Sequence, residues 1–282
     1  MNKPYSSFIG CEAEYDEAKT VIFGAPFDST TSYRPGTRAA GRVIRSESFG
    51  IETYSPYQDK DLEDIRVFDA GELDLSFGNP ERALNDIEAF TSKVINDGKI
   101  PCMIGGEHLV SLGAIRAAIK KYPDLCIIHF DAHADLREDY LGEKLSHACV
   151  LRRTWELIGD GRIFQFGIRS GTRDEFYWAK DHVNMQKFNF NGLEEIVKKL
   201  NNKPVYFTLD LDVLDVSVFP GTGTPEGGGV SFTELLNACL KLSGLNIIGF
   251  DMNELSPMLD LSGGSTAVAC KILRELLLSF YK

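Results

Sequence analysis

Short apolar runs recur along this chain, and stretches with a helical spacing of apolar residues separate several of them. The runs predict strands at residues 21–23, 66–68, 102–104, 125–130, 163–166, 205–209 and 246–250. The helical spacing predicts helices at residues 80–96, 109–121, 232–242 and 266–280. Strands that alternate with helices favour a parallel sheet covered on both faces, with ligand sites at the carboxyl ends of its strands.

The composition narrows the classes of protein that fit. The 282 residues, 43% of them hydrophobic, fit one large α/β domain, and we expect residues 1–282 to form a single domain because no linker or repeat divides them. No apolar run approaches the ~20 residues of a membrane span. The formal net charge of −11 counts against nucleic acid and anionic membranes as partners, and it suits cations.

The cysteines and the first residues indicate the compartment. The chain has six scattered cysteines without a CxxC pair, and residues 1–8 lack the apolar core of a signal peptide. We therefore expect free thiols and a cytoplasmic location.

Metal-capable side chains follow one of the predicted strands at regular spacing. Asp131, His133 and Asp135 are two residues apart, and side chains with this spacing on an extended segment face the same way. Three such groups converging at a strand end indicate a metal site. The alternative is a polar loop whose aspartates cap a helix.

Two other strand ends carry similar groups. Asp210 and Asp212 close the run at 205–209, where two neighbouring carboxylates repel each other unless a cation lies between them. His108 follows Gly105-Gly106-Glu107 directly after the run at 102–104. Taken alone, the aspartates also fit a turn, and a single histidine at a strand–helix junction is more often structural.

Together the three segments point to one crevice at the carboxyl edge of the sheet. The set contains oxygen and nitrogen donors without a thiolate, which favours Mn²⁺ or a similar divalent ion over a cysteine-bound zinc. Six ligands are enough for two ions, and paired metals hold and activate a water. The six expected ligands are His108, Asp131, His133, Asp135, Asp210 and Asp212.

Further side chains could take part in chemistry at such a site. His147, in the loop after the first cluster, could carry a proton near neutral pH, although it also fits a surface histidine. Glu254 follows the run at 246–250 and could bind a cationic substrate head, although it also fits a solvated loop carboxylate. For His129, which precedes Asp131 by two residues, we favour a supporting or packing role.

In order and spacing these motifs resemble those of the ureohydrolase family, which includes the arginases and agmatinases. The resemblance covers nearly the whole chain and is most like that of the short bacterial agmatinases. The segments that carry it are 24–28, 33–38, 105–108, 131–135, 146–147, 210–215, 220–225 and Glu254. It implies a three-layer α/β/α fold around an eight-stranded, mostly parallel sheet.

The resemblance also implies a binuclear site with two Mn²⁺ per subunit. Its first ion would be held by His108, Asp131, Asp135 and Asp210. Its second ion would be held by Asp131, His133, Asp210 and Asp212, so that Asp131 and Asp210 bridge the two. The family likeness further implies a homo-oligomer, either a trimer or a hexamer.

Several positions depart from the family pattern without removing an expected ligand. Glu107 stands where many members have Asp, and we expect it to support the neighbouring ligand His108. Ala148 follows His147 where Gly is frequent, and Val216 stands where Pro is usual. Ala40-Gly41 replaces a common Gly-Pro.

The function implied by the resemblance is hydrolysis of agmatine, a small cationic guanidino compound, to putrescine and urea. The metals would supply a hydroxide that attacks the guanidinium carbon. Asp135 would align this nucleophile, and Glu254 would pair with the guanidinium. His147 would pass a proton to the departing amine.

The sequence leaves the substrate open. Glu138, Asp139 and Glu143 in the loop beside His147 suit a cationic tail, whereas Arg137 and Lys144 in that loop counter this reading. Guanidinobutyrate and arginine are therefore alternatives to agmatine. A non-catalytic metal-binding scaffold or polyamine sensor is a rival of another class, and a single-zinc deacetylase of related fold is a weaker one.

Overall fold

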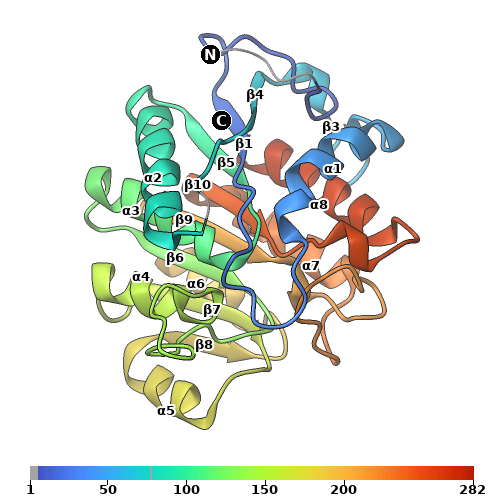
Figure 1. Cartoon of the computed structure of the whole chain (residues 1–282). Helices are drawn as coiled ribbons and strands as arrows, with labels where there is room; N and C mark the ends of the chain where they lie inside the picture. Colours follow the sequence, from blue (N-terminus) through green and yellow to red (C-terminus); the bar gives the residue numbers. More distant parts are fainter. Residues whose placement is uncertain (1–5, 77) are drawn as a thin grey trace.

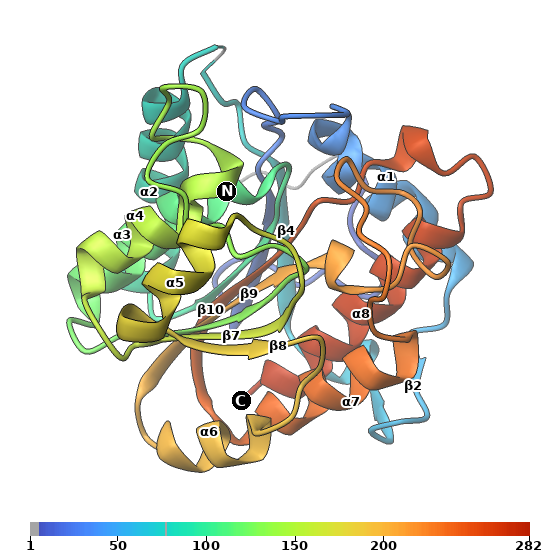
Figure 2. The ribbon, with the colours of Figure 1, turned by 90° about the horizontal axis from the view of Figure 1, so that it is seen from below.

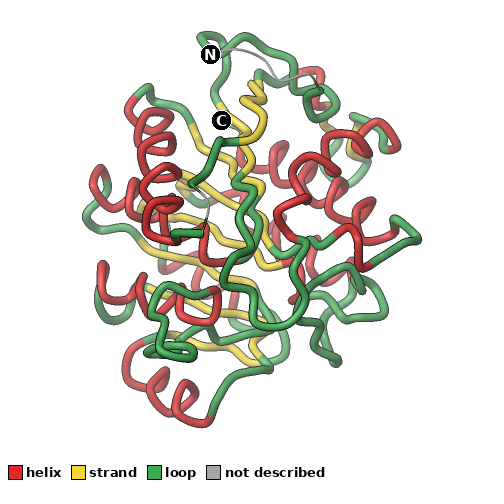
Figure 3. The backbone as a smooth tube through the Cα atoms, in the orientation of Figure 1, coloured by secondary structure: helices red, strands yellow, loops and turns green. Residues whose placement is uncertain are grey.

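The computed structural model describes residues 6–76 and 78–282, and an eight-stranded sheet runs through its centre (Figures 1 and 3). Every pair of neighbouring strands in this sheet is parallel, in the order β4-β1-β5-β10-β9-β6-β7-β8. The strands are β1 (Thr20–Gly24), β4 (Val67–Glu72), β5 (Ile100–Ile104), β6 (Cys126–Phe130), β7 (Ile163–Ile168), β8 (Asn184–Lys187), β9 (Pro204–Asp210) and β10 (Asn246–Asn253).

Helices cover both faces of the sheet, as expected (Figures 1 and 2). One layer contains α2 (Pro80–Asn96), α3 (Ser111–Lys121), α4 (Val150–Ile158) and α5 (Arg173–His182). The other contains α1 (Ala40–Glu47), α6 (Leu193–Lys199), α7 (Phe232–Lys241) and α8 (Gly264–Phe280). The predicted three-layer α/β/α architecture is therefore confirmed.

The hydrophobic pattern explains the three layers. Successive side chains of a strand point to opposite faces, so each central strand feeds two cores. In β6, Ile128 packs in the core beneath α7 and α8, while Ile127 packs in the core beneath α2 and α3. All five residues of β6 and all seven of β9 are buried, which is the near-continuous apolar run typical of a covered parallel sheet.

The seven predicted strands are all present, and the eighth was not predicted from the apolar runs. This strand, β8, has the sequence Asn-Met-Gln-Lys and lies at the sheet edge with no fully buried residue. An edge strand buries little apolar surface, so its sequence carries little apolar signal. The antiparallel hairpin of β2 (Tyr54–Ser55) and β3 (Lys60–Asp61) lies outside the sheet.

The strand order decides where the sequence motifs meet. Strands β5, β10, β9 and β6 are neighbours at the centre of the sheet, and the segment after each one carries a candidate site residue. In parallel strands the carboxyl ends share one edge, so these segments converge. Within the described residues, no helix is both long and apolar enough to cross a membrane.

Candidate metal centre

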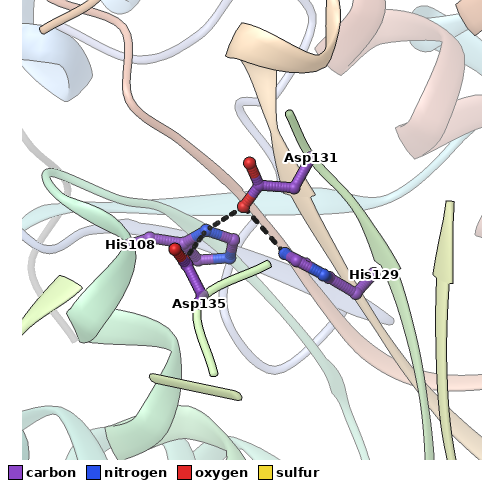
Figure 4. A group of neighbouring side chains, drawn as sticks. All are labelled: His108, His129, Asp131 and Asp135. Carbon is purple, nitrogen blue, oxygen red and sulfur yellow. Dashed lines mark hydrogen bonds and ion pairs between the residues drawn. The ribbon is translucent and has the colours of Figure 1, made fainter. Parts of the chain in front are cut away.

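The side chain of His108 lies at the middle of a cage of carboxylates. Its Nδ1 atom is 3.0 Å from Asp131 Oδ2, 3.2 Å from Asp210 Oδ2 and 3.4 Å from Asp135 Oδ2. His108 and Asp131 are fully buried, and Figure 4 shows their side chains turned toward each other and toward Asp135. The four residues expected at the first ion are therefore brought together.

A second cluster shares Asp131 with the first. His133 Nδ1 is 3.0 Å from Asp212 Oδ2 and 3.5 Å from Asp131 Oδ1. Asp131 thus directs one carboxylate oxygen to His108 and the other toward His133. Ligand-capable atoms of Asp131, His133 and Asp212 all lie within 4.8 Å of one another, a spacing that one ion can bridge.

The local backbone differs from the extended segment that the spacing suggested. Strand β6 ends at Phe130, His133 makes only an isolated bridge with Ser170, and Asp135 has a left-handed φ of 55°. The three side chains therefore converge through a shaped loop and not through strand alternation.

The two aspartates after β9 also meet in a different way from that expected. Asp210 is the last residue of β9, while Asp212 lies in a short 3-10 helix, η6 (Leu211–Val213). The Asp210 carboxylate accepts a hydrogen bond from the Asp212 N–H at 2.8 Å, so one candidate ligand caps the turn that carries another.

The close glycine packing at the end of β5 fixes His108. A Cβ atom on Gly106 would lie 2.0 Å from the Phe27 carbonyl oxygen, so only glycine fits this backbone approach. The next residue, Glu107, donates its N–H to the same carbonyl at 2.8 Å. His108 then begins a short 3-10 helix, η4 (His108–Val110), that leads into α3.

Buried like charges set the electrostatics of the cage. Burial, followed by repulsion from Asp212 and Asp131, raises the pKa of Asp210 well above its usual range. Burial alone would lower the pKa of His108, but its carboxylate partners Asp131, Asp135 and Asp210 outweigh this and raise it well above its usual range. Negative charge therefore dominates the cage and draws in positive charge.

This donor set fits divalent cations. Four carboxylates and two imidazoles, all but His133 buried, supply the oxygen and nitrogen atoms that such ions prefer. Two cations would neutralise the four carboxylates, which burial otherwise opposes in their charged form. The first cluster contains His108, Asp131 and Asp135 as expected, with His129 in addition, and the second contains Asp131, His133 and Asp212. Asp210 lies beside His108 at 3.2 Å, and its expected bridging role stays a prediction.

His129 contacts Asp131 and links it to the neighbouring strand. Its Nε2 atom is 2.8 Å from Asp131 Oδ2, and its Nδ1 atom is 3.1 Å from Gln165 Nε2 (Figure 4 shows the His129–Asp131 contact). The same Gln165 amide donates to the carbonyl of Ala134, so it ties His129 to the loop that carries the candidate ligands. The supporting role favoured for His129 agrees with these contacts.

A cavity of about 270 Å³ opens beside the cage. His133 and Asp135 of the cage line it, and so does His147. Its remaining wall residues are Ser32, Ala134, Arg137, Tyr140, Ala148, Ser170, Gly171, Thr172, Glu175 and Thr224. Ser32, Tyr140, Ser170, Thr172 and Glu175 were not predicted from the sequence, because single residues in separate loops form no recognisable spacing.

His147 is half-buried and differs from His108 in its surroundings. Burial, followed by the positive charges of His133 and His108, lowers the pKa of its imidazole to about 4. Its Nε2 atom accepts a hydrogen bond from the Ser32 N–H at 3.2 Å. The ring is therefore uncharged at neutral pH, and it lines the cavity. It is not the free surface histidine of the alternative reading.

Glu254 is also buried, with 3% of its surface exposed. Its Oε1 atom accepts the His108 N–H at 2.7 Å, so the solvated loop carboxylate of the alternative reading is wrong. Burial and repulsion from Asp212 and Glu107 raise its pKa well above the usual range. Glu254 is not among the residues that line the cavity described above.

The acidic side chains of the loop beside His147 do not line this cavity either. Glu138 pairs with Arg152 at 2.9 Å, and Asp139 accepts the Gly142 N–H within its own turn. Glu143 accepts the Leu145 N–H. The expectation that these carboxylates meet a cationic tail is not supported, and the charged wall residues away from the cage are Arg137 and Glu175.

Known proteins share both the sequence and the fold of this chain. The sequence model of the arginase family matches residues 18–279. An agmatinase of Bacillus subtilis (strain 168) is 48% identical over 279 residues, which cover 98% of this chain and 96% of that protein. A guanidinobutyrase of Pseudomonas aeruginosa is 32% identical over 278 residues, which cover 94% of this chain and 87% of that protein.

A solved structure shows the same likeness in three dimensions. This structure, from Clostridium difficile and provisionally described as an agmatinase, superposes with a TM-score of 0.93 at 51% identity. The superposition covers 95% of this chain and 99% of that one. The shared region therefore includes the central sheet and nearly the whole chain around the clustered side chains.

Proposed function

The chain belongs to the arginase family, and from this premise we propose that it is an agmatinase-type ureohydrolase that splits agmatine and water into putrescine and urea. The cage of four carboxylates and two histidines beside a cavity carries the proposal. A cage of this composition serves metal-assisted hydrolysis, and agmatinases are among the relatives with nearly half of their residues identical.

The cofactor in this proposal is two Mn²⁺ per subunit. His108, Asp131, Asp135 and Asp210 would hold one ion, and Asp131, His133, Asp210 and Asp212 the other. When bound, such a pair of ions supplies hydroxide at neutral pH by lowering the pKa of a water. The ligand chemistry supports a hard or borderline divalent ion, and Mn²⁺ is the choice among these that the family resemblance favours.

The chain's own residues would divide the remaining work. Asp135, on both the cage and the cavity wall, would accept a hydrogen bond from the nucleophile and align it. Glu254 would attract the guanidinium, since a buried carboxylate with a raised pKa gains from a cationic partner. His147, uncharged and beside the cavity, would take up the proton that the attacking water gives up and deliver it to the amine nitrogen as the C–N bond breaks.

The three candidate substrates differ in the group at the end of the tail. Agmatine ends in an ammonium, guanidinobutyrate in a carboxylate, and arginine in both groups. The distal wall offers one cation, Arg137, and one carboxylate, Glu175, which are paired at 3.7 Å. This balanced pair does not exclude a carboxylate tail, so guanidinobutyrate stays the main alternative within the class, and a guanidinobutyrase is among the relatives.

A non-catalytic metal-binding scaffold is the rival of a different class. A scaffold needs the cage but has no use for an uncharged histidine on the cavity wall. The presence of His147 in the same cavity lining as Asp135 therefore favours the enzyme.

The proposal extends to the domain organisation, the oligomer and the cellular location. We treat residues 1–282 as one domain, which the single continuous sheet supports. A homo-oligomer, trimer or hexamer, is proposed on the family resemblance. A cytoplasmic location is proposed on the cysteines, all six of which are buried as free thiols.

A substrate panel tests the proposed function. Protein reconstituted with Mn²⁺ is given agmatine, guanidinobutyrate and arginine side by side, and the release of urea is measured. The proposal expects the highest kcat/KM with agmatine. A higher value with either other compound would reject the substrate, and tight binding of all three without urea release would favour the scaffold. The same panel after metal removal serves as the control.

A further inference from the structure

His147 begins a short 3-10 helix, η5 (His147–Cys149), whose first N–H is held by a residue far away in the sequence. The first N–H groups of a helix need acceptors from outside it, and the preceding side chain usually supplies one. Here the preceding residue, Ser146, makes no such bond. The His147 N–H instead donates to Thr30 Oγ1 at 3.1 Å, across 117 residues of sequence.

The hydroxyl of Thr30 is oriented by a buried carboxylate. It donates its one proton to Glu107 Oε1, and the Thr30 N–H donates to Glu107 Oε2 at 2.8 Å. The backbone N–H of His147 can only donate, so Thr30 Oγ1 must present a lone pair to it and direct its own proton to Glu107. Glu107 thus holds Thr30 by both backbone and side chain.

Glu107 is itself held in place by burial and by a backbone hydrogen bond. It is fully buried, and its N–H donates to the Phe27 carbonyl beside the close approach at Gly106. A continuous path therefore runs from the end of β5 through Glu107 and Thr30 to the backbone of His147.

The same loop also contacts the imidazole of His147. Ser32, two residues after Thr30, donates its N–H to His147 Nε2. One segment therefore holds His147 at both its backbone and its ring, and Ser32 and His147 lie on the same cavity wall. A shift of this segment would move the ring relative to the cage.

We propose that Glu107 and Thr30 are positioning residues that set the placement of His147 for proton transfer; this rests on the proposed function, in which His147 serves the departing amine. Neither residue touches the cavity, so their effect is transmitted through the hydrogen bonds to His147. Their loss should lower kcat while leaving substrate affinity and metal loading in place.

The chain offers a matched pair of variants for the test. Thr30→Val removes the hydroxyl that links Glu107 to His147 and keeps the shape of the side chain. Thr31→Val removes a hydroxyl that donates to the same carboxylate, at 3.1 Å from Oε2, but has no hydrogen bond to His147 among the described residues. Thr30→Ser restores the hydroxyl and serves as the rescue, and Thr30→Ala is a second loss variant in case the valine fails to fold.

The first readout is steady-state agmatine hydrolysis by manganese-loaded protein. We expect Thr30→Val to lower kcat about 10- to 10²-fold, because small displacements of a reacting group carry losses of this size. KM and the metal content per subunit should stay near wild type, and Thr30→Ser and Thr31→Val should keep most of kcat. In a His147→Gln background, Thr30→Val should cause little further loss, because both changes act on one step.

The second readout does not depend on activity. Hydrogen–deuterium exchange of the backbone around His147 should be faster in Thr30→Val than in wild type, and unchanged in Thr31→Val. Equal kcat in Thr30→Val and Thr31→Val, or unchanged exchange in Thr30→Val, would overturn the positioning role alone. Wild-type protein that splits no guanidino compound would overturn the proposed function together with it, so the two failures are distinguishable.

Discussion

Two histidines begin short helices at the same site, and the structure holds them in different ways. His108 is fully buried in contact with three carboxylates, whereas His147 is half-buried and its ring accepts a hydrogen bond from Ser32. The pKa of His108 is raised by those carboxylates, while burial lowers the pKa of His147 to about 4. The neighbours of the two histidines therefore shift the pKa of the same kind of side chain in opposite directions.

The two helix starts nevertheless share one device. Neither Glu107 nor Ser146, the residues before the two histidines, caps its own helix with its side chain. Glu254 accepts the His108 N–H from 146 residues away, and Thr30 accepts the His147 N–H from 117 residues away. Long-range caps couple each histidine to a distant loop, so the site is assembled only when the whole sheet is in place.

The largest effect should come from breaking the cage around His108. Asp131→Asn weakens contacts to His108, His129 and His133 together, and we expect activity to fall on the order of 10³-fold or more with reduced metal content. Metal per subunit is measured by mass spectrometry and urea release by assay. Asp160→Asn, the same change in the exposed Asp160–His182 pair, is the control and should leave both unchanged. Full metal content and activity in Asp131→Asn would contradict the cage.

A smaller effect is expected at His147. His147→Gln should lower kcat about 10²-fold, the lower end of what proton transfer by a positioned group contributes. Because His147 has no hydrogen bond or ion pair with the cage carboxylates among the described residues, metal per subunit should not change. Loss of metal together with activity would place His147 among the ligands and erase the contrast with His108.

A substitution at Glu254 can separate its hydrogen bond with the His108 N–H from its negative charge. Glu254→Gln keeps an oxygen that can accept the His108 N–H but removes the negative charge. If Glu254 attracts the guanidinium, kcat/KM for agmatine should fall about tenfold, mainly through KM, in line with the loss of about 1.5 kcal/mol for a hydrogen bond to a charged group. An unchanged KM would limit Glu254 to its capping role.

The smallest effect concerns the loop that follows Glu254. Asp260 accepts hydrogen bonds from Ser262 and Ser265 at the start of α8, and these lower the pKa of its carboxyl to about 2. Asp260→Asn should lower Tm at pH 7 by about 2 °C, a typical result for weakening one helix cap in a chain of this size.

The pH dependence of the Tm loss in Asp260→Asn tests the role of the Asp260 charge more directly than the loss at pH 7 does. A depressed carboxyl pKa stabilises the fold above the unfolded value of about 3.9, and this stabilisation fades as pH falls toward 2. The Tm difference between wild type and Asp260→Asn, followed by calorimetry, should therefore shrink from pH 6 to pH 3. A constant difference would mean that the charge of Asp260 does not anchor this loop.

Much of the fold was predictable because the pattern of apolar residues that marks strands and helices is local in the sequence. The apolar runs of β5, β6 and β9 and the helical spacing of α2 and α8 appear in the sequence as periods of a few residues. The polar edge strand β8 shows the limit, since a strand that buries little has no such period. The six expected ligands were found in the same way, as polar groups directly after apolar strands.

The sequence by itself determined which elements form and which residue types stand at their ends, because hydrophobic periodicity and turn chemistry act between near neighbours. The tertiary structure alone decided that β5, β10, β9 and β6 lie side by side, that Glu254 is buried against His108, and that Glu107 reaches His147 through Thr30. The hydrogen bonds of Glu254 and Thr30 join residues 77 to 146 positions apart. No local pattern encodes them, since each depends on the order in which the strands pack to bury their apolar faces.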